Sequence, residues 1–241
     1  AGQLDAAETS LQRVMAERAD SAEAEHFMGR VALARGELPT ALQHLARAVR
    51  LDPQRAEFHL YFGEAQLESN ALGRAIEEVQ TALELDDTLA QGYFLRGRVG
   101  LRSGAVRDAR DDFLRALQLA PGLHAARAGL GEAYDQLGER GDAVRAYEQA
   151  VAGDATKGEW WYRLGRLRLD AGRRAEALGA LVRATELGDA LEDAPRWLAN
   201  AHRWRAEAHR LGGQRGDAIR HYERYLELAP ASDLDRTEVQ D

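Results

Sequence analysis

The sequence of 241 residues contains no cysteine. Disulfide bonds, zinc sites with thiolate ligands and cysteine nucleophiles are therefore excluded. The absence leaves the compartment open, because proteins of the cytoplasm and of the bacterial periplasm can both lack cysteine. No run of apolar residues approaches the roughly 18 needed to cross a membrane, so we expect no direct membrane insertion.

Lysine and proline are nearly as scarce. Only Lys157 accompanies the arginines among the 32 basic residues, a bias that indicates a GC-rich, bacterial genome. With five prolines, long stretches are free to form helix, and the abundance of Ala, Leu, Arg and Glu favours it. The formal net charge of −8 does not attract phosphate groups, so we expect no nucleic acid as a partner.

Small residues return at a fixed interval. Alanines 34 residues apart stand at Ala7, Ala41, Ala75, Ala109, Ala143 and Ala177, and Ala218 follows after seven extra residues. Twelve residues before these lie Gly29, Gly63, Gly97, Gly131, Gly165 and Ala206. Between the two series lie Gly36, Asn70, Gly104, Gly138, Gly172 and Gly213. The period predicts stacked helical hairpins in which the small residues of two helices meet and a left-handed residue makes the turn.

These residues resemble the tetratricopeptide repeat family. The best matches to its pattern are Leu130, Gly131, Tyr134, Ala143, Tyr147 and Ala150, and Trp161, Leu164, Gly165, Ala177 and Ala184. Glu25, His59, Arg127 and His202 replace the first aromatic residue of that pattern. The resemblance implies an all-α fold, a right-handed superhelical solenoid of antiparallel helix pairs, with a first helix A and a second helix B in each repeat.

We predict one solenoid over residues 1–232. Its repeats are 22–55, 56–89, 90–123, 124–157, 158–191 and 199–232. Residues 1–21 are predicted to be an orphan helix B, left by truncation or covered by a partner. The insertion 192–198 is expected to lengthen the last helix A by about two turns, with Asp193 as a cap and Pro195 in the first turn. Residues 233–241 are predicted to form an acidic tail.

In this family helix A lines the concave surface, so the resemblance implies a groove for a protein or peptide partner. The groove positions carried over to this sequence are His26, Arg30, Leu60, Phe94, Arg98, Leu101, Arg102, Tyr162 and Arg166. We expect apolar anchors of an extended or helical segment near Phe94, Leu101 and Tyr162. The alternative is that these side chains only complete the packing within repeats. Charges of alternating sign at one recurring position of helix A, such as Arg30, Glu64 and Arg98, would then form internal ion pairs.

Two tryptophans near the insertion, Trp197 and Trp204, lie seven residues apart and would share a helix face. One interpretation is a protruding docking surface, since tryptophan is frequent at binding hot spots. The other is that both side chains pack on the preceding repeat or cover the end of the solenoid.

No residue pattern indicates catalysis. The histidines form no HExxH pair, no Walker loop occurs, and Gly129 and Gly131 do not continue into a dinucleotide fingerprint. We therefore expect no enzyme, metal or cofactor. The leading hypothesis is a scaffold or adaptor in a bacterial secretion, motility or envelope assembly. The alternatives are a targeting arm of a larger enzyme and a module that associates end to end with itself.

Overall fold

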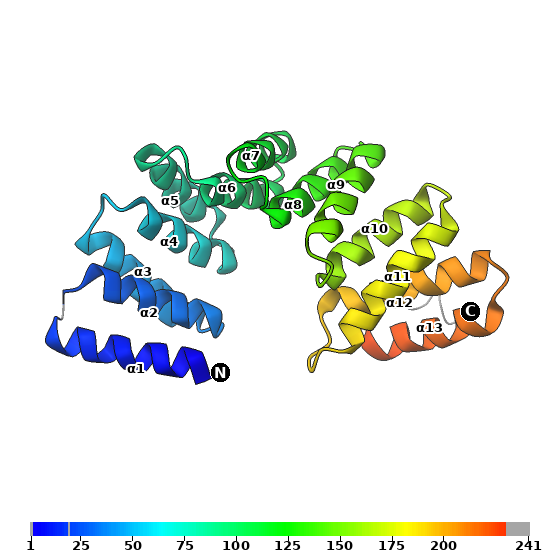
Figure 1. Ribbon diagram of the computed structural model, residues 1–241, viewed down its shortest axis with the longest axis horizontal. Helices are drawn as coiled ribbons and strands as arrows, with labels where there is room; N and C mark the ends of the chain where they lie inside the picture. Colours follow the sequence, from blue (N-terminus) through cyan, green and yellow to red (C-terminus); the bar gives the residue numbers. More distant parts are fainter. Residues whose placement is uncertain (1, 19, 230–241) are drawn as a thin grey trace. The chain divides into compact units, whose positions relative to one another are not determined.

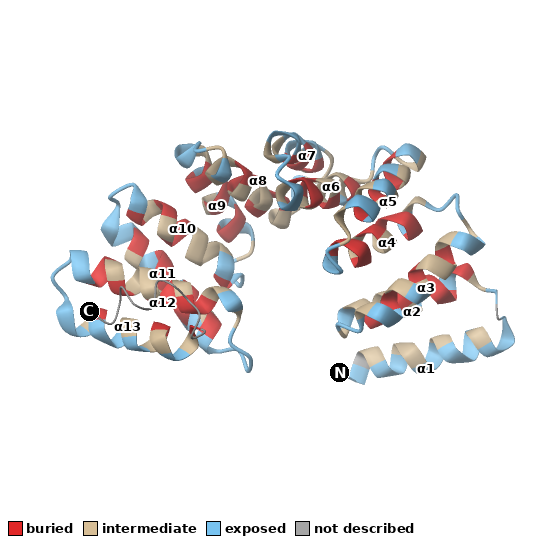
Figure 2. Cartoon of the chain, turned by 180° about the vertical axis from the view of Figure 1, so that it is seen from behind, coloured by how far each residue is buried: buried red, intermediate tan, exposed pale blue. Residues whose placement is uncertain are grey.

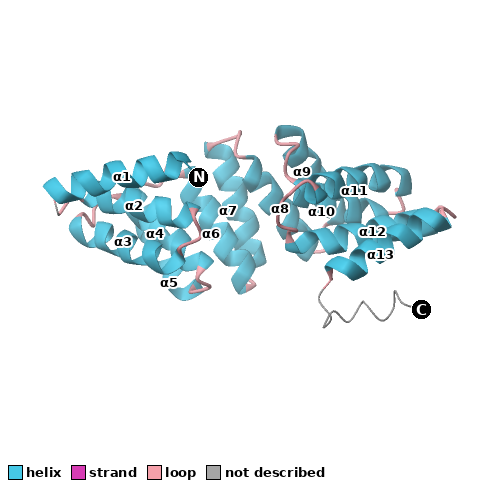
Figure 3. Ribbon diagram, turned by 90° about the horizontal axis from the view of Figure 1, so that it is seen from below, coloured by secondary structure: helices cyan, strands magenta, loops and turns pink. Residues whose placement is uncertain are grey.

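The described residues, 2–18 and 20–229 of the computed structural model, form thirteen α-helices and no strand (Figures 1 and 3). The helices are α1 (Gly2–Glu17), α2 (Ala22–Ala34), α3 (Leu38–Leu51), α4 (Ala56–Glu68), α5 (Leu72–Leu85), α6 (Ala90–Ser103), α7 (Val106–Leu119), α8 (His124–Gln136), α9 (Arg140–Gly153), α10 (Gly158–Asp170), α11 (Arg174–Asp189), α12 (Arg196–Leu211) and α13 (Arg215–Leu228). The predicted all-α class of stacked helix pairs is confirmed.

The helices from α2 onward follow one another in pairs. The first helices α2, α4, α6, α8 and α10 begin at the residues where the first five predicted repeats begin. The division into repeats stays a prediction, and the predicted tail, 233–241, lies outside the described residues. The chain divides into two compact units, Ala1–Gly129 and Leu130–Asp241, and the prediction of one solenoid stays a prediction. Each unit is described by itself.

A left-handed residue lies in each turn between the two helices of a pair. These residues are Gly36, Asn70, Gly104, Gly138, Gly172 and Gly213, as the period predicts. Asn70 has a φ of 61°, a conformation that asparagine tolerates better than most side chains. The next residue often bonds back across the end of the first helix: the Ala71 N–H donates to the Gln66 carbonyl at 2.9 Å.

The recurring glycines of the first helix lie closest to large side chains, and Gly63 and Gly165 also lie close to the carbonyl groups of the recurring Ala75 and Ala177. A β-carbon at Gly29, Gly63, Gly97, Gly131 or Gly165 would lie 2.5–2.9 Å from Leu45, Val79, Phe113, Tyr147 or Leu181, respectively. These side chains come from helix B, one turn after its recurring alanine. The alanines themselves are fully buried, and Figure 2 shows such buried positions along the facing sides of the helices. Glycine is therefore needed to admit a bulky neighbour.

The seven-residue insertion forms mainly a loop. Helix α11 continues to Asp189, residues 190–195 are not helical, and α12 begins only at Arg196. Helix α12 thus has 16 residues where α10 has 13, so the expected gain of about two turns is wrong. Pro195 is the N-cap, and no side chain bonds there, so Asp193 does not act as the cap. Proline disfavours helical backbone in the residue before it, which prevents an earlier start.

Candidate functional site

A cavity of about 270 Å³ lies between α4 and α6 in the first unit. Its walls are Leu60, Tyr61 and Glu64 from α4 and Gln91, Phe94, Leu95 and Arg98 from α6. Leu60 and Leu95 are buried and form an apolar floor, whereas Phe94 is half-buried. Because α4 and α6 are successive first helices, the cavity lies on the face that sequence reasoning selected. We call it the A-helix groove.

The A-helix groove brings together three of the predicted residues, Leu60, Phe94 and Arg98. Leu101 and Arg102 lie farther along α6 and do not line the cavity; the Arg102 guanidinium instead donates to the Leu67 carbonyl at 2.6 Å. Sequence reasoning missed Tyr61 and Gln91 as groove residues. The prediction took its positions from the family pattern alone. The aromatic character of Tyr61, directly after Leu60, was the signal that could have identified it.

The prediction that His26 lies in the groove is wrong. Its side chain is only 1% exposed, because the ring stacks on Phe58 with 4.8 Å between centroids and meets the edge of Tyr61 at 5.1 Å. Burial lowers the pKa of His26, while Glu57, 3.5 Å from Nε2, opposes that shift. His26 is a core residue and cannot contact a partner without rearrangement.

Arg30 lies between two aromatic rings. Its guanidinium is 4.5 Å from the centroid of Tyr61 and 5.5 Å from that of Phe27, close enough for cation–π attraction. Arg30 also lines a second cavity, of about 500 Å³, with Leu4, Leu11 and other residues of α1 and α2. Phe27 remains 45% exposed at that cavity.

Arg98 is held by carboxylates of its own unit. Its ion pairs join Nη1 to Glu64 at 3.6 Å and Nη2 to Glu68 at 2.7 Å, and its guanidinium lies 5.8 Å from the Phe94 centroid. Burial raises the pKa of Glu64, and Arg98 opposes that rise. The alternative of internal ion pairs therefore describes Arg98 and Glu64. Such pairs also orient the guanidinium before any partner arrives.

Tyr162 and Arg166 belong to the second unit. Tyr162 is half-buried beside a core cluster of Leu169, Ala177, Leu181 and Ala208, and burial raises the pKa of its hydroxyl. Arg166 forms ion pairs with Asp135 and with Asp170, the latter at 3.4 Å. Both residues thus take part in packing or pairing within their own unit, and Tyr162 keeps some exposed surface.

Both tryptophans pack on the preceding helix pair. A β-carbon at Gly158 or Gly188 would lie 2.5 or 2.9 Å from Cη2 of Trp197, so this ring occupies space left by the two glycines. Trp204 packs on the same cluster as Tyr162. Both are half-buried. This arrangement favours the packing interpretation over a protruding docking surface.

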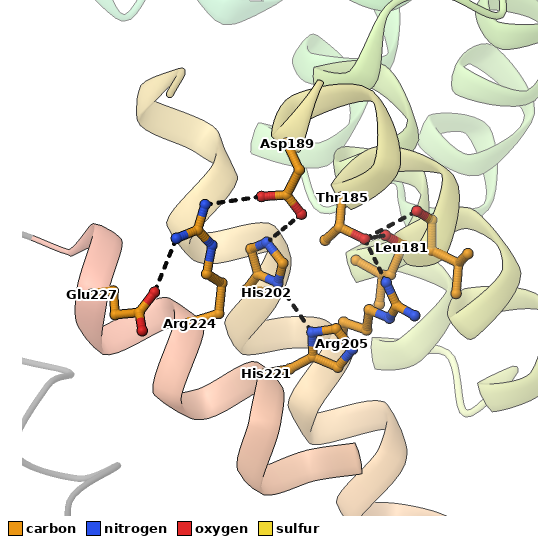
Figure 4. A network of polar contacts seen from close by, with 9 residues as sticks. Leu181, Thr185, Asp189, His202, Arg205, His221, Arg224 and Glu227 are labelled. Atoms are coloured by element: carbon orange, nitrogen blue, oxygen red, sulfur yellow. Dashed lines mark hydrogen bonds and ion pairs between the residues drawn. The ribbon is translucent and has the colours of Figure 1, made fainter. Parts of the chain in front are cut away.

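Three imidazoles stack where α12 meets α13. His221 lies between His202 and His209, with centroids 5.3 and 5.6 Å away. Asp189 accepts from Arg224 at 3.2 Å, and its other oxygen lies 3.2 Å from Nε2 of His202 (Figure 4). Burial and the nearby Arg205 lower the pKa of His221 to about 4. The described residues contain no group of three or more potential ligands placed to hold a metal ion.

A model of the tetratricopeptide repeat family matches residues 1–54, 27–90 and 128–195. No curated protein sequence matches the chain. Among the described residues, no helix combines the length and the apolar character that a membrane span requires.

Solved structures share the fold. A chain of the APC/C hetero-tetramer Cut9–Hcn1 is 17% identical with a TM-score of 0.86 over 99% of this chain, which spans only 46% of that chain. PilF of Pseudomonas aeruginosa is 19% identical with a TM-score of 0.79, over 91% of this chain and 96% of its own. YrrB, described as a repeat protein with an unusual peptide-binding site, is 21% identical with a TM-score of 0.60. The match covers 78% of this chain and 93% of YrrB.

Proposed function

The chain belongs to the tetratricopeptide repeat family, and we propose that it is a scaffold or adaptor that binds a peptide or helical segment of a partner protein. The proposed site is the A-helix groove. The observation that carries the proposal is the cavity between α4 and α6, where a half-buried ring, Phe94, borders an apolar floor. Such a surface suits one apolar side chain of an incoming segment.

The polar wall of the groove supports the same function. Arg98 and Glu64 offer opposite charges beside the apolar floor, and Gln91 offers an amide. A bound segment can therefore pair its backbone or side chains with groups that are already oriented. Leu101, Arg102, Tyr162 and Arg166 remain proposed contacts, while the packing of Trp197 and Trp204 supports a structural role for both.

We place this role in a bacterial assembly for secretion, motility or envelope maintenance, in the cytoplasm or periplasm. The near absence of lysine supports a bacterial source, and the net charge of −8 supports protein rather than nucleic acid as the partner. We propose no catalytic role, because no residue pattern in the sequence indicates catalysis. A targeting arm of a larger enzyme is the alternative.

Peptide display tests the A-helix groove. Short random peptides are selected on the immobilised full chain, and the affinity of each enriched peptide is measured by fluorescence anisotropy. Phe94→Ala should weaken binding by about tenfold or more, because it removes the ring beside the floor. The control Leu114→Ala removes a 38% exposed side chain from α7 and should leave affinity unchanged. Equal affinities of all three proteins for every peptide would reject the groove.

Self-association is a second candidate, favoured by the exposed Phe27 beside the cavity of α1 and α2. Uncovered ends of a repeat array can stack on one another. Light scattering over a range of concentrations should then show a growing mass that Phe27→Glu abolishes. A mass that stays constant would count against this candidate.

A further inference from the structure

A further cavity, of about 410 Å³, lies between α3 and α4 in the first unit. Leu42, Ala46 and Phe62 form its apolar walls, and Arg50, Gln66 and Arg74 supply polar groups. Helical periodicity places Phe62 and Gln66 on the side of α4 opposite to Leu60 and Glu64. The cavity is therefore separate from the A-helix groove, and we call it the outer cavity.

Gln66 has a buried side-chain oxygen without a partner among the described residues. The residue is 4% exposed, and its side-chain Oε1 accepts no hydrogen bond from any described residue. Leaving such a group unpaired costs free energy, so structures seldom retain one without a reason. Because Gln66 lines the outer cavity, a rotation of its side chain would bring the covered Oε1 to an N–H or O–H group that enters the cavity.

Two arginines border the same cavity. Arg50 is the last of the α3 residues that line the cavity, and Arg74 belongs to the first turn of α5. Both are exposed, and neither guanidinium bonds or pairs with another described residue. In contrast, Arg98 and Arg166 are already paired with carboxylates. Two unpaired guanidinium groups at one cavity, in a chain of net charge −8, can pair with carboxylates of a ligand.

The equivalent position one repeat later has the opposite charge. A cavity of about 600 Å³ there is lined by Gly100 where Gln66 stands and by Asp108 where Arg74 stands, 34 residues apart in each case. Asp111 adds a carboxylate that is paired with Arg110 at 2.9 Å, and Arg96 is neutralised by Asp112 at 2.6 Å. The buried amide and the free arginines are thus properties of the outer cavity and not of the repeat.

We propose that the outer cavity binds an acidic peptide segment of a partner protein. An apolar side chain of the segment fills the space between Leu42, Ala46 and Phe62. Carboxylates of its Asp or Glu residues pair with Arg50 and Arg74, and one of its N–H groups donates to Oε1 of Gln66. This site is independent of the A-helix groove, so the protein can hold two segments at once.

The test uses peptide display on the full chain, with counter-selection on Arg50→Glu/Arg74→Glu. Enriched peptides should carry net negative charge and a large apolar residue. Fluorescence anisotropy measures the affinity of each enriched peptide. The Arg50→Glu/Arg74→Glu variant should lower this affinity by about tenfold or more, and added salt should lower it too. Gln66→Leu should lower it as well, since it removes the acceptor.

Two control variants separate this site from its neighbours. Asp108→Asn alters the equivalent cavity and Phe94→Ala alters the A-helix groove, and both should leave these affinities unchanged. Circular dichroism confirms that each variant is folded. The proposal is overturned if no peptide is enriched, if the enriched peptides are neutral or basic, or if Phe94→Ala weakens them as much as the double arginine variant does.

Discussion

The ring of Phe113 packs against the backbone of Gly97 so closely that a β-carbon on the glycine would lie 2.7 Å from Cε1. Phe113 is fully buried, so the ring has no space into which to move. The same relation between a first-helix glycine and a bulky residue of the second helix recurs along the chain. It is the contact that sets how closely the two helices of a pair approach.

Gly97→Leu should therefore destabilise the protein. Overpacking of a filled core costs typically about 1–3 kcal/mol, and here the added side chain meets three ring atoms. Thermal unfolding followed by circular dichroism measures the effect. The matched control is Gly179→Leu, because nothing lies within 4 Å of a β-carbon at that helical glycine. The control should raise stability by about 0.5–1 kcal/mol through helix propensity, and equal losses in both variants would contradict the packing argument.

Ala109→Arg should have a larger effect. Ala109 is fully buried, and a β-carbon at Gly100 would already lie 3.1 Å from the alanine methyl group. A guanidinium there would have neither volume nor a partner charge, so we expect a loss of about 3 kcal/mol or more. Helicity and melting temperature are the measurements, with the exposed Ala105→Arg as the control. A melting temperature equal to that of the parent would refute the assigned register.

Stability should fall as the pH falls from about 6.5 to about 4. The folded-state pKa of His221 is lowered to about 4, mainly by burial and by Arg205, whereas an unfolded histidine titrates near 6.5. In this window the unfolded chain binds a proton that the folded chain does not, so protonation favours unfolding. Because the ring is only partly buried, we expect a loss of about 1–3 kcal/mol.

His221→Leu isolates this histidine from other acid effects. The variant should lose part of the decline in melting temperature between pH 7 and pH 4.5, since the carboxylates that also titrate are unchanged. The exposed Ile219→Leu, on the same helix and without a titratable group, serves as the control and should keep the parent's pH profile. If melting temperature depends on pH in the same way for His221→Leu and for the parent, His221 is not the source of the acid sensitivity.

Gln66→Leu should stabilise the fold while it removes the proposed acceptor of the outer cavity. The leucine fills similar space without a buried oxygen that lacks a partner, a gain of about 1 kcal/mol. Urea unfolding of the parent and the variant measures the difference. A stabilised variant that no longer binds acidic peptides cannot have lost binding by unfolding. A loss of stability would instead mean that Gln66 has a structural partner.

The sequence allowed the helix pairs and their turns to be predicted because both follow from local chemistry that repeats. Gly104 and Asn70 occupy turns that few other residues tolerate. The glycine contacts were harder to predict, because Gly97 lies closest to Phe113, which comes one turn after the alanine in register. Likewise, the loop before α12 depends on Pro195, which limits the residue before it.

The binding surfaces were only partly predictable. Family register selected Leu60 and Phe94, which line one cavity, but it also selected His26, which is covered by Phe58 from the next helix pair. Burial of this kind depends on what the neighbouring repeat supplies. The outer cavity was missed altogether, because a lone Gln66 carries no signal until the residues around it are known to leave it without a partner.

Photo-crosslinking at Phe94 tests the central claim most directly. The residue is replaced by benzoylphenylalanine in the full chain, and the same replacement at Leu114, an exposed residue of α7, is the control. A peptide selected on the parent and weakened by Phe94→Ala should crosslink at position 94 and not at position 114. Crosslinking at position 114 alone would contradict the account, because the partner segment would then lie away from the A-helix groove.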